Sequence, residues 1–271
     1  MTHLKKHLAV LGFLLAAAVP AFAQQVIKLS TTTSTENSGL LQYLLPKFEA
    51  KTNSRVSVIS VGTGKALELA RNGDVDVTLV HARASEDKFV AEGHGVNRRD
   101  VMYNDFIIVG PETDPAKIKG SKDVLEAMKK ITASGAKFIS RGDNSGTDQM
   151  ERAYWKQVGS QPQGGNYVSA GLGMGEVLTM AAELRAYTLT DRATYIAYRA
   201  KTGLQIVVEG DAKMFNPYGI IAVNPNNFPQ ANYKGAMQLV EWITSSEGQK
   251  LIAAFKVEGQ QVFFPSYKAA Q

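Results

Sequence analysis

The chain has 271 residues, with 30 basic and 25 acidic side chains and no cysteine. A formal charge of +5, carried by dispersed basic residues, gives no support for binding to nucleic acid or to a membrane surface. Without cysteine there are no disulfides, so a conventional hydrophobic core has to hold the fold.

The first 23 residues have the pattern of a secretion signal. Lys5 and Lys6 form its basic region, an apolar run covers 8–18, and Ala21-Phe22-Ala23 is a small-residue cleavage site. The apolar run is too short to span a bilayer. We expect cleavage after Ala23, which leaves 28 basic and 25 acidic residues and a formal charge of +3. The mature chain is then expected to be periplasmic and monomeric, with no membrane-embedded segment and no lipid anchor.

The rest of the chain alternates strand-like and helix-like segments. Apolar, β-branched runs predict strands at 26–30, 55–61, 76–80, 105–109, 137–140, 187–189, 204–208 and 217–223. Apolar residues at helical spacing predict helices at 40–48, 65–71, 124–131, 147–158, 176–184, 192–199, 233–244 and 246–255. Ser38 is expected to cap the first helix, and Pro46 to kink or split it. Alternating elements of this kind indicate parallel sheets with helices on both faces.

A mature length of about 250 residues suits two lobes better than one. Gly110-Pro111 and Asn216-Pro217 lie at the ends of apolar runs, and we place the crossings between lobes there. One lobe would then cover 24–109 plus 217–271, and the other would cover 110–216.

Three junctions between a strand and a helix carry hydroxyl groups or small residues. They are Thr31-Thr32-Thr33-Ser34, Val61-Gly62-Thr63-Gly64-Lys65 and Arg141-Gly142-Asp143-Asn144-Ser145-Gly146-Thr147. A helix begins with unpaired backbone N–H groups, and ligands of α/β sheets bind beyond the carboxyl ends of the strands. If the three junctions converge there, they can bind a small oxyanion through neutral donors, with Arg141 as a charged clamp.

Each junction also has a purely structural interpretation. The threonines favour a strand end, Ser145 suits an N-cap, and Arg141 can simply pair with Asp143. The glycine-rich junction does not match a nucleotide phosphate loop, because Ile59 and Ala66 stand where that motif needs Gly and Ser or Thr.

The sequence offers little catalytic equipment. Ser145 lacks the spacing of a nucleophile elbow, and neither His81 nor His94 has an obvious Ser or Asp partner. Two histidines and no cysteine also speak against a metal site. We therefore expect no enzyme activity, no catalytic residue and no cofactor. The alternative from another class is a secreted serine hydrolase that uses Ser145, and it would need a histidine within hydrogen-bonding reach.

Together these segments resemble the tungstate-binding proteins of ABC importers, a branch of the type II periplasmic binding proteins. The resemblance rests on the three junctions, on Ser38-Gly39-Leu40, on 188–195 and on Asn216-Pro217-Tyr218-Gly219. It implies two α/β lobes joined by a hinge, with one tungstate or molybdate ion in the cleft between them. It also implies that the protein delivers this ion to an ABC transporter permease.

The resemblance further implies which residues contact the anion: Thr32, Ser34, Thr63, Arg141, Ser145 and Thr147. Asp143 would orient Arg141 rather than touch the ion. A phosphate- or sulfate-binding protein of the same fold is the alternative, because the phosphate-binding family also uses a Ser-Gly-Thr helix start. Tungstate is fully deprotonated at neutral pH, whereas phosphate carries a proton that needs an acceptor. We therefore expect no free carboxylate at the site.

Overall fold

The structure is a computed structural model that describes residues 24–267. The predicted signal segment 1–23 and its cleavage site lie outside these residues. Within the described range, no helix is long and apolar enough to cross a membrane.

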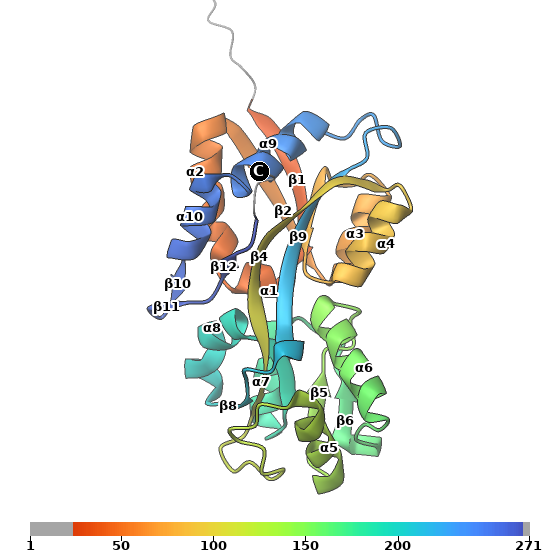
Figure 1. Ribbon diagram of the computed structural model, residues 1–271, viewed down its shortest axis with the longest axis vertical. Helices are drawn as coiled ribbons and strands as arrows, with labels where there is room; N and C mark the ends of the chain where they lie inside the picture. The colour runs from red at the N-terminus through yellow and green to blue at the C-terminus, as the bar shows by residue number, and fades with distance from the viewer. Residues whose placement is uncertain (1–23, 268–271) are drawn as a thin grey trace, which may run out of the picture.

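The chain forms two lobes, an upper and a lower one in the view of Figure 1. The upper lobe begins with β1 (Gln25–Thr32), α1 (Thr33–Asn37), α2 (Leu40–Thr52), β2 (Ser54–Val61), α3 (Thr63–Arg71), β3 (Val77–Val80) and α4 (Arg83–Ala91). It is completed by α9 (Tyr233–Ile243), α10 (Ser246–Ala254), β10 (Lys256–Val257), β11 (Gln260–Gln261) and β12 (Phe264–Pro265). The two long strands β4 (Gly95–Gly110) and β9 (Phe215–Val223) link the two lobes.

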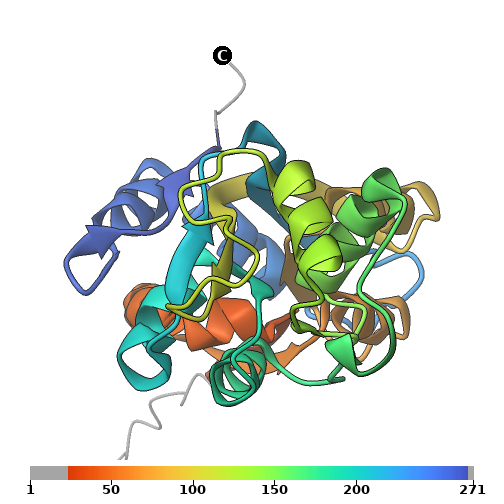
Figure 2. The ribbon, with the colours of Figure 1, turned by 90° about the horizontal axis from the view of Figure 1, so that it is seen from below.

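The lower lobe contains the middle of the chain. Its elements are α5 (Val124–Ser134), β5 (Phe138–Ser140), α6 (Gly146–Val158), η1 (Gly164–Asn166), β6 (Tyr167–Ser169), α7 (Met174–Glu183), β7 (Thr188–Asp191), α8 (Arg192–Thr202), β8 (Gln205–Val208) and η2 (Ala212–Met214). Seen from below in Figure 2, α5 and α6 lie on one side and α8 on the other. The prediction of two α/β lobes is thus confirmed.

The sheets are mixed, so the prediction of parallel sheets was only partly right. β1 pairs in parallel with β2 and β3, and β5 pairs in parallel with β6. β9 runs antiparallel to both β3 and β4. The reason is that β4 leaves the upper lobe and β9 returns to it after the chain has formed the lower lobe, so the two paired strands run in opposite directions.

The pairing of β4 changes partway along the strand. Its upper part, through Asp105, pairs with β9, and its lower part, from Phe106 to Gly110, pairs with β7 and β8. A single strand therefore belongs to the sheets of both lobes. The crossings that we placed at Gly110 and Asn216 fall at the lower ends of these two strands, and the lobe boundaries stay a prediction.

Two local predictions at α2 held only in part or not in the form expected. Pro46 does not split the helix, which continues to Thr52; Pro46 and Gln42 are both exposed, so water can satisfy the carbonyl that loses its partner. Gly39 at φ +80°, and not Ser38, occupies the N-cap position of α2. The Ser38 hydroxyl still accepts from the N–H of Leu40, the first residue of α2 (3.3 Å), and donates to the Thr35 carbonyl of α1 (2.6 Å).

The apolar core continues from one lobe into the other. Its largest cluster includes Ile27, Leu44 and Leu239 of the upper lobe, and Leu178 and Ile196 of the lower lobe. The two lobes share this core on the side of the molecule where α1 packs against α7 and α8. The lobes are therefore joined by packed side chains as well as by β4 and β9.

A separate apolar cluster of the lower lobe encloses one carboxylate. Glu151 is 1% exposed and accepts hydrogen bonds from Trp155 Nε1 (2.9 Å) and the Tyr167 hydroxyl (2.8 Å). Burial raises the pKa of Glu151 to about 7. The folded protein therefore holds a proton on Glu151 at pH values where the unfolded chain has released it.

This proton makes stability depend on pH. Above the usual glutamate pKa, unfolding releases the proton, so the contribution of Glu151 to the free energy of unfolding should fall by about 3 kcal/mol at most as pH rises to about 7. The lowered pKa of the buried His81 acts in the opposite direction, so the contribution of Glu151 is the difference between wild type and Glu151→Gln. In Glu151→Gln the amide oxygen can keep both hydrogen bonds, and this fall should disappear. Urea denaturation at several pH values measures it, with the exposed Glu126→Gln as control. If the free energy of unfolding changed equally with pH in Glu151→Gln and in wild type, the prediction would be contradicted.

Candidate anion-binding site

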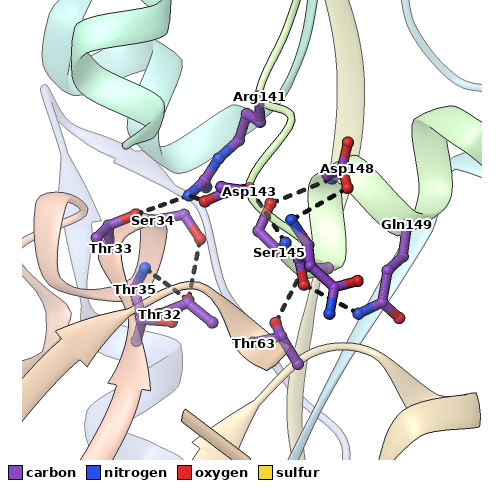
Figure 3. A network of polar contacts seen from close by, with 12 residues as sticks. Thr32, Thr33, Ser34, Thr35, Thr63, Arg141, Asp143, Ser145, Asp148 and Gln149 are labelled. Atoms are coloured by element: carbon purple, nitrogen blue, oxygen red, sulfur yellow. Dashed lines mark hydrogen bonds and ion pairs between the residues drawn. The ribbon is translucent and has the colours of Figure 1, made fainter. Parts of the chain in front are cut away.

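The three junctions meet where the lobes face each other, as Figure 3 shows. The predicted site residues from the upper lobe are Thr32, Ser34 and Thr63. Those from the lower lobe are Arg141, Ser145 and Thr147. All six side chains are at most 1% exposed, which is unusual for five hydroxyls and a guanidinium. The structure thus brings the whole predicted set into one buried polar region.

On the upper side the hydroxyls form a tight group at the start of α1. Thr32 Oγ1 accepts from the Thr35 backbone N–H (3.3 Å) and lies 3.0 Å from Ser34 Oγ. Thr31 belongs to the same motif but points elsewhere, and its hydroxyl donates to the Leu79 carbonyl (2.8 Å). Neighbouring strand residues face opposite sides of the sheet, so Thr31 and Thr32 point apart, whereas Thr33 and Ser34 already belong to α1 and reach the junction between the lobes with Thr32.

On the lower side Arg141 is a buried cation. Its Nη2 donates to Asp143 Oδ2 and to Thr33 Oγ1 (3.0 Å). Its Nε and Nη1 are buried and have no hydrogen-bond partner among the described residues. A buried donor without a partner costs about 1–3 kcal/mol, and more when it is charged. The expected pairing of Arg141 with Asp143 is confirmed, but it satisfies only part of the guanidinium.

Ser145 begins α6. Its hydroxyl accepts from the Asp148 N–H (3.2 Å), so the N-cap interpretation is confirmed, and its own N–H donates to Asp143 Oδ1 (3.1 Å). Two residues on, the Thr147 hydroxyl is buried and has no partner among the described residues. Asp143 therefore uses one carboxylate oxygen on Arg141 and the other on this helix start.

Direct contacts close the lobes over this region. The Gly146 N–H donates to Thr63 Oγ1 (2.9 Å), and the Gly64 N–H donates to the Asn144 carbonyl (3.2 Å). A Cβ atom on Gly146 would lie 2.8 Å from the His81 carbonyl oxygen and 2.9 Å from its Nδ1. The start of α6 can approach the upper lobe this closely only because residue 146 is glycine.

The comparison with known proteins agrees with this geometry. The model of the PBP superfamily domain matches residues 19–247. The chain belongs to the PBP superfamily. It is 50% identical over 248 residues to the tungstate-binding protein TupA of Peptoclostridium acidaminophilum, which covers 90% of this chain and 87% of that one.

Solved structures of the PBP superfamily have the same fold. The structure described as the tungstate ABC transporter from Geobacter sulfurreducens is 58% identical, with a TM-score of 0.79, and covers 85% of this chain and 98% of that one. The tungstate-binding protein TupA from Desulfovibrio alaskensis G20 is 45% identical, with a TM-score of 0.76, and covers 90% of this chain and all of that one. The type II fold expected from the sequence is confirmed.

Sequence reasoning missed the part that His81 plays in this PBP-superfamily site. Its Nε2 lies 3.1 Å from both Thr32 Oγ1 and Ser34 Oγ, and its Nδ1 lies 3.0 Å from Asn216 Oδ1. Burial, with the charge of Arg141 as a smaller cause, lowers the pKa of His81 to about 4. A signal was available, because His81 directly follows the strand 77–80, and the carboxyl end of this strand lies at the same sheet edge as the Thr32 and Thr63 junctions.

The geometry does not favour a hydrolase built on Ser145. Among the described residues, no histidine is hydrogen-bonded to Ser145, whose hydroxyl is used as a helix cap. His81 faces Thr32 and Ser34 instead, which lie fully buried. The same described range contains no cluster of three or more His, Cys, Asp or Glu side chains that could hold a metal ion.

The contact between Gly146 and His81 gives a test of how tightly the lobes are packed. Gly146→Ala should lower the free energy of unfolding by about 1–3 kcal/mol, because the new methyl group overlaps backbone that has little room to move. Urea denaturation measures this change. Gly165→Ala is the matched control, since a Cβ there meets nothing within 4 Å. Equal stability of the two variants would show that the lobes separate at low cost.

Proposed function

We propose that the protein captures tungstate between its two lobes and delivers it to an ABC transporter permease, and that molybdate binds at the same place. The observation that carries the proposal is the buried guanidinium of Arg141, whose Nε and Nη1 have no partner among the described residues. An oxyanion placed against these atoms would supply the missing acceptors and a compensating charge.

The remaining donors suit an anion that carries no proton of its own. The hydroxyls of Thr32, Ser34, Thr63 and Thr147 lie buried in the same polar region as Arg141 and the start of α6, and each hydroxyl can donate one hydrogen bond. Tungstate and molybdate are fully deprotonated at neutral pH and accept at every oxygen. A buried site composed of donors therefore stabilises them without leaving a ligand proton unpaired.

The carboxylates near Arg141 are already used. Asp143 accepts from Arg141 and from the Ser145 N–H, and the fully buried Asp191 accepts from Asn104 Nδ2 (3.3 Å) and from the N–H and hydroxyl of Thr194. Neither is available for the proton of a bound phosphate. This disfavours the phosphate alternative, and the smaller sulfate should fit a tungstate-sized site poorly.

Relatives support the choice of anion and the class of protein. Those at 40–50% identity include tungstate-binding proteins named TupA, and a further one is described as a putative ABC transporter anion-binding protein. We accordingly infer a non-enzymatic, monomeric, periplasmic protein, exported by the signal segment 1–23 and cleaved after Ala23. Its partners are then the oxyanion and the permease.

Calorimetric titration of the mature protein tests the choice of anion. We expect tungstate and molybdate to bind, and sulfate and phosphate to bind far more weakly or not at all. In Asp143→Asn the ratio of the phosphate and tungstate dissociation constants should stay as in wild type, because Asp143 orients Arg141 and does not accept a ligand proton.

Two results would count against this choice. Phosphate binding that Asp143→Asn abolishes, with tungstate binding retained, would make Asp143 a ligand and phosphate the natural anion. Failure of the wild type to bind any of the four anions would remove the binding function itself.

Arg141 should contribute a large part of the affinity. Arg141→Ala is expected to weaken tungstate binding by at least about 2 kcal/mol, roughly 30-fold, since it removes a buried charged donor and leaves Asp143 without its partner. The same titration measures it, with Arg199→Ala as control because that side chain is 43% exposed and pairs with Glu258. Wild-type affinity in Arg141→Ala would remove Arg141 from the site.

A further inference from the structure

A buried chain of hydrogen bonds connects the proposed anion site with the strands that join the lobes. It runs from Asp191 at the end of β7 to Asn104 on β4 (3.3 Å), then to Asn216 on β9 (2.6 Å) and to His81 after β3 (3.0 Å). All four side chains are at most 3% exposed. The chain thus takes members from both lobes and from both crossing strands.

The carboxylate at one end fixes the direction of every bond. Burial raises the pKa of Asp191, but the N–H and hydroxyl of Thr194 donate to its two oxygens and, with the charge of Arg141, favour the ionised form. The ionised Oδ1 can only accept, so the atom of Asn104 beside it is the amide nitrogen. The Asn104 oxygen therefore faces the Asn216 nitrogen, and the Asn216 oxygen faces His81. An amide oxygen can only accept, so the Nδ1 of His81 carries a proton.

The other ring nitrogen is consequently an acceptor in the neutral imidazole. Nε2 lies 3.1 Å from the hydroxyl oxygens of Thr32 and Ser34, which are the only groups that the described residues place within hydrogen-bonding distance of it. Each hydroxyl has a single hydrogen. When Thr32 and Ser34 both donate to an oxyanion, no hydrogen remains for Nε2, and a buried acceptor is left unpaired.

We propose that oxyanion capture is coupled to the uptake of one proton by His81. The proton comes from solvent and binds the lone pair of Nε2, with no other bond made or broken, and the complex gains one positive charge. The imidazolium then donates to the oxygens of Thr32 and Ser34, and their two hydrogens turn to the anion. His81 acts through these hydroxyls and is a positioning residue. The inference rests on the proposed function.

The surroundings of His81 explain why the proton arrives together with the anion. Burial and the charge of Arg141 keep the imidazole neutral in the protein alone, with a pKa of about 4, although Asp143 acts in the opposite direction. The N-terminus of α6 at Gly146 adds positive potential beside the ring. A dianion in the same place adds two negative charges and favours the imidazolium.

The other titratable groups near the His81 ring do not supply the negative charge that favours the imidazolium. On β9, Tyr218 stacks on His81 at 4.7 Å between ring centroids, and burial raises the pKa of Tyr218 well above its usual value, so it stays neutral. On α4, Glu86 is paired with Arg98. Asp191 is separated from the ring by two amides. A hollow of about 420 Å³ lined by His81 and Asn216 provides a route for the proton from solvent.

Calorimetry of tungstate binding in buffers of different ionisation enthalpy measures the coupling directly. Between about pH 6 and 8 the wild type should take up a net fraction of a proton that rises toward one as pH falls. The dissociation constant should increase with pH, by up to about tenfold per unit. His81→Gln should bind without proton uptake, and His94→Gln should behave like wild type, since His94 stacks on Phe89 away from the site.

Nitrogen NMR of the wild type gives an answer even if His81→Gln does not fold. The mature chain has two histidines, so the ring signals of His81 can be assigned with His94→Gln. We expect Nδ1 alone to be protonated in the free protein, and both nitrogens in the tungstate complex. Tungstate binding with no proton uptake at any of these pH values, or with uptake that persists in His81→Gln, would overturn the inference and leave the proposed function intact. No tungstate binding at all would instead refute the proposed function.

Discussion

The site depends on one buried ion pair, between Arg141 and Asp143. A lone guanidinium would be expensive to bury, and Asp143 reduces that cost by pairing with Nη2 while its second oxygen holds the start of α6. The same carboxylate therefore fixes both the cation and the helix N-terminus in one position. It leaves Nε and Nη1 of Arg141 facing the buried polar region without a protein partner among the described residues. A ligand with several acceptor oxygens and negative charge completes this arrangement better than any group the described residues supply.

The lobes bring the two halves of this arrangement together. β4 and β9 pass between the lobes as continuous strands, and a shared apolar core supports them on the side of α1, α7 and α8. On the other side the lobes are hydrogen-bonded directly, by the Gly146 N–H to the Thr63 hydroxyl and by the Gly64 N–H to the Asn144 carbonyl. Binding at the junction can therefore stabilise the closed arrangement, because the donors of the two lobes are complete only when the lobes are in contact.

The amide chain from Asp191 to His81 gives the crossing strands a second role. Asn104 and Asn216 lie on the two strands that link the lobes, and their orientation fixes which nitrogen of His81 carries its proton. In the proposed complex, the hydroxyls that donate to the anion are thus oriented by groups that do not contact it. A buried polar network of this kind is stable only when each donor meets an acceptor, so arrival of an anion has to rearrange hydrogens beyond its own contacts.

The sequence by itself predicted the lobed α/β fold, most of its elements and the residues that the structure gathers at the candidate site. Junction motifs follow strand ends, and the parallel strands β1 and β2 bring Thr32 and Thr63 to one sheet edge. Arg141 follows β5 of a separate sheet, so the packing of the lobes brings it to them. Strand direction could not be read, since an apolar run such as 217–223 looks the same in a parallel and an antiparallel pair. The helix α1 was missed because five residues are too short to show a period. Only the tertiary structure decided that His81, Asn104, Asn216 and Asp191 form one chain, because these residues are far apart in sequence and their hydrogen bonds depend on how the lobes pack.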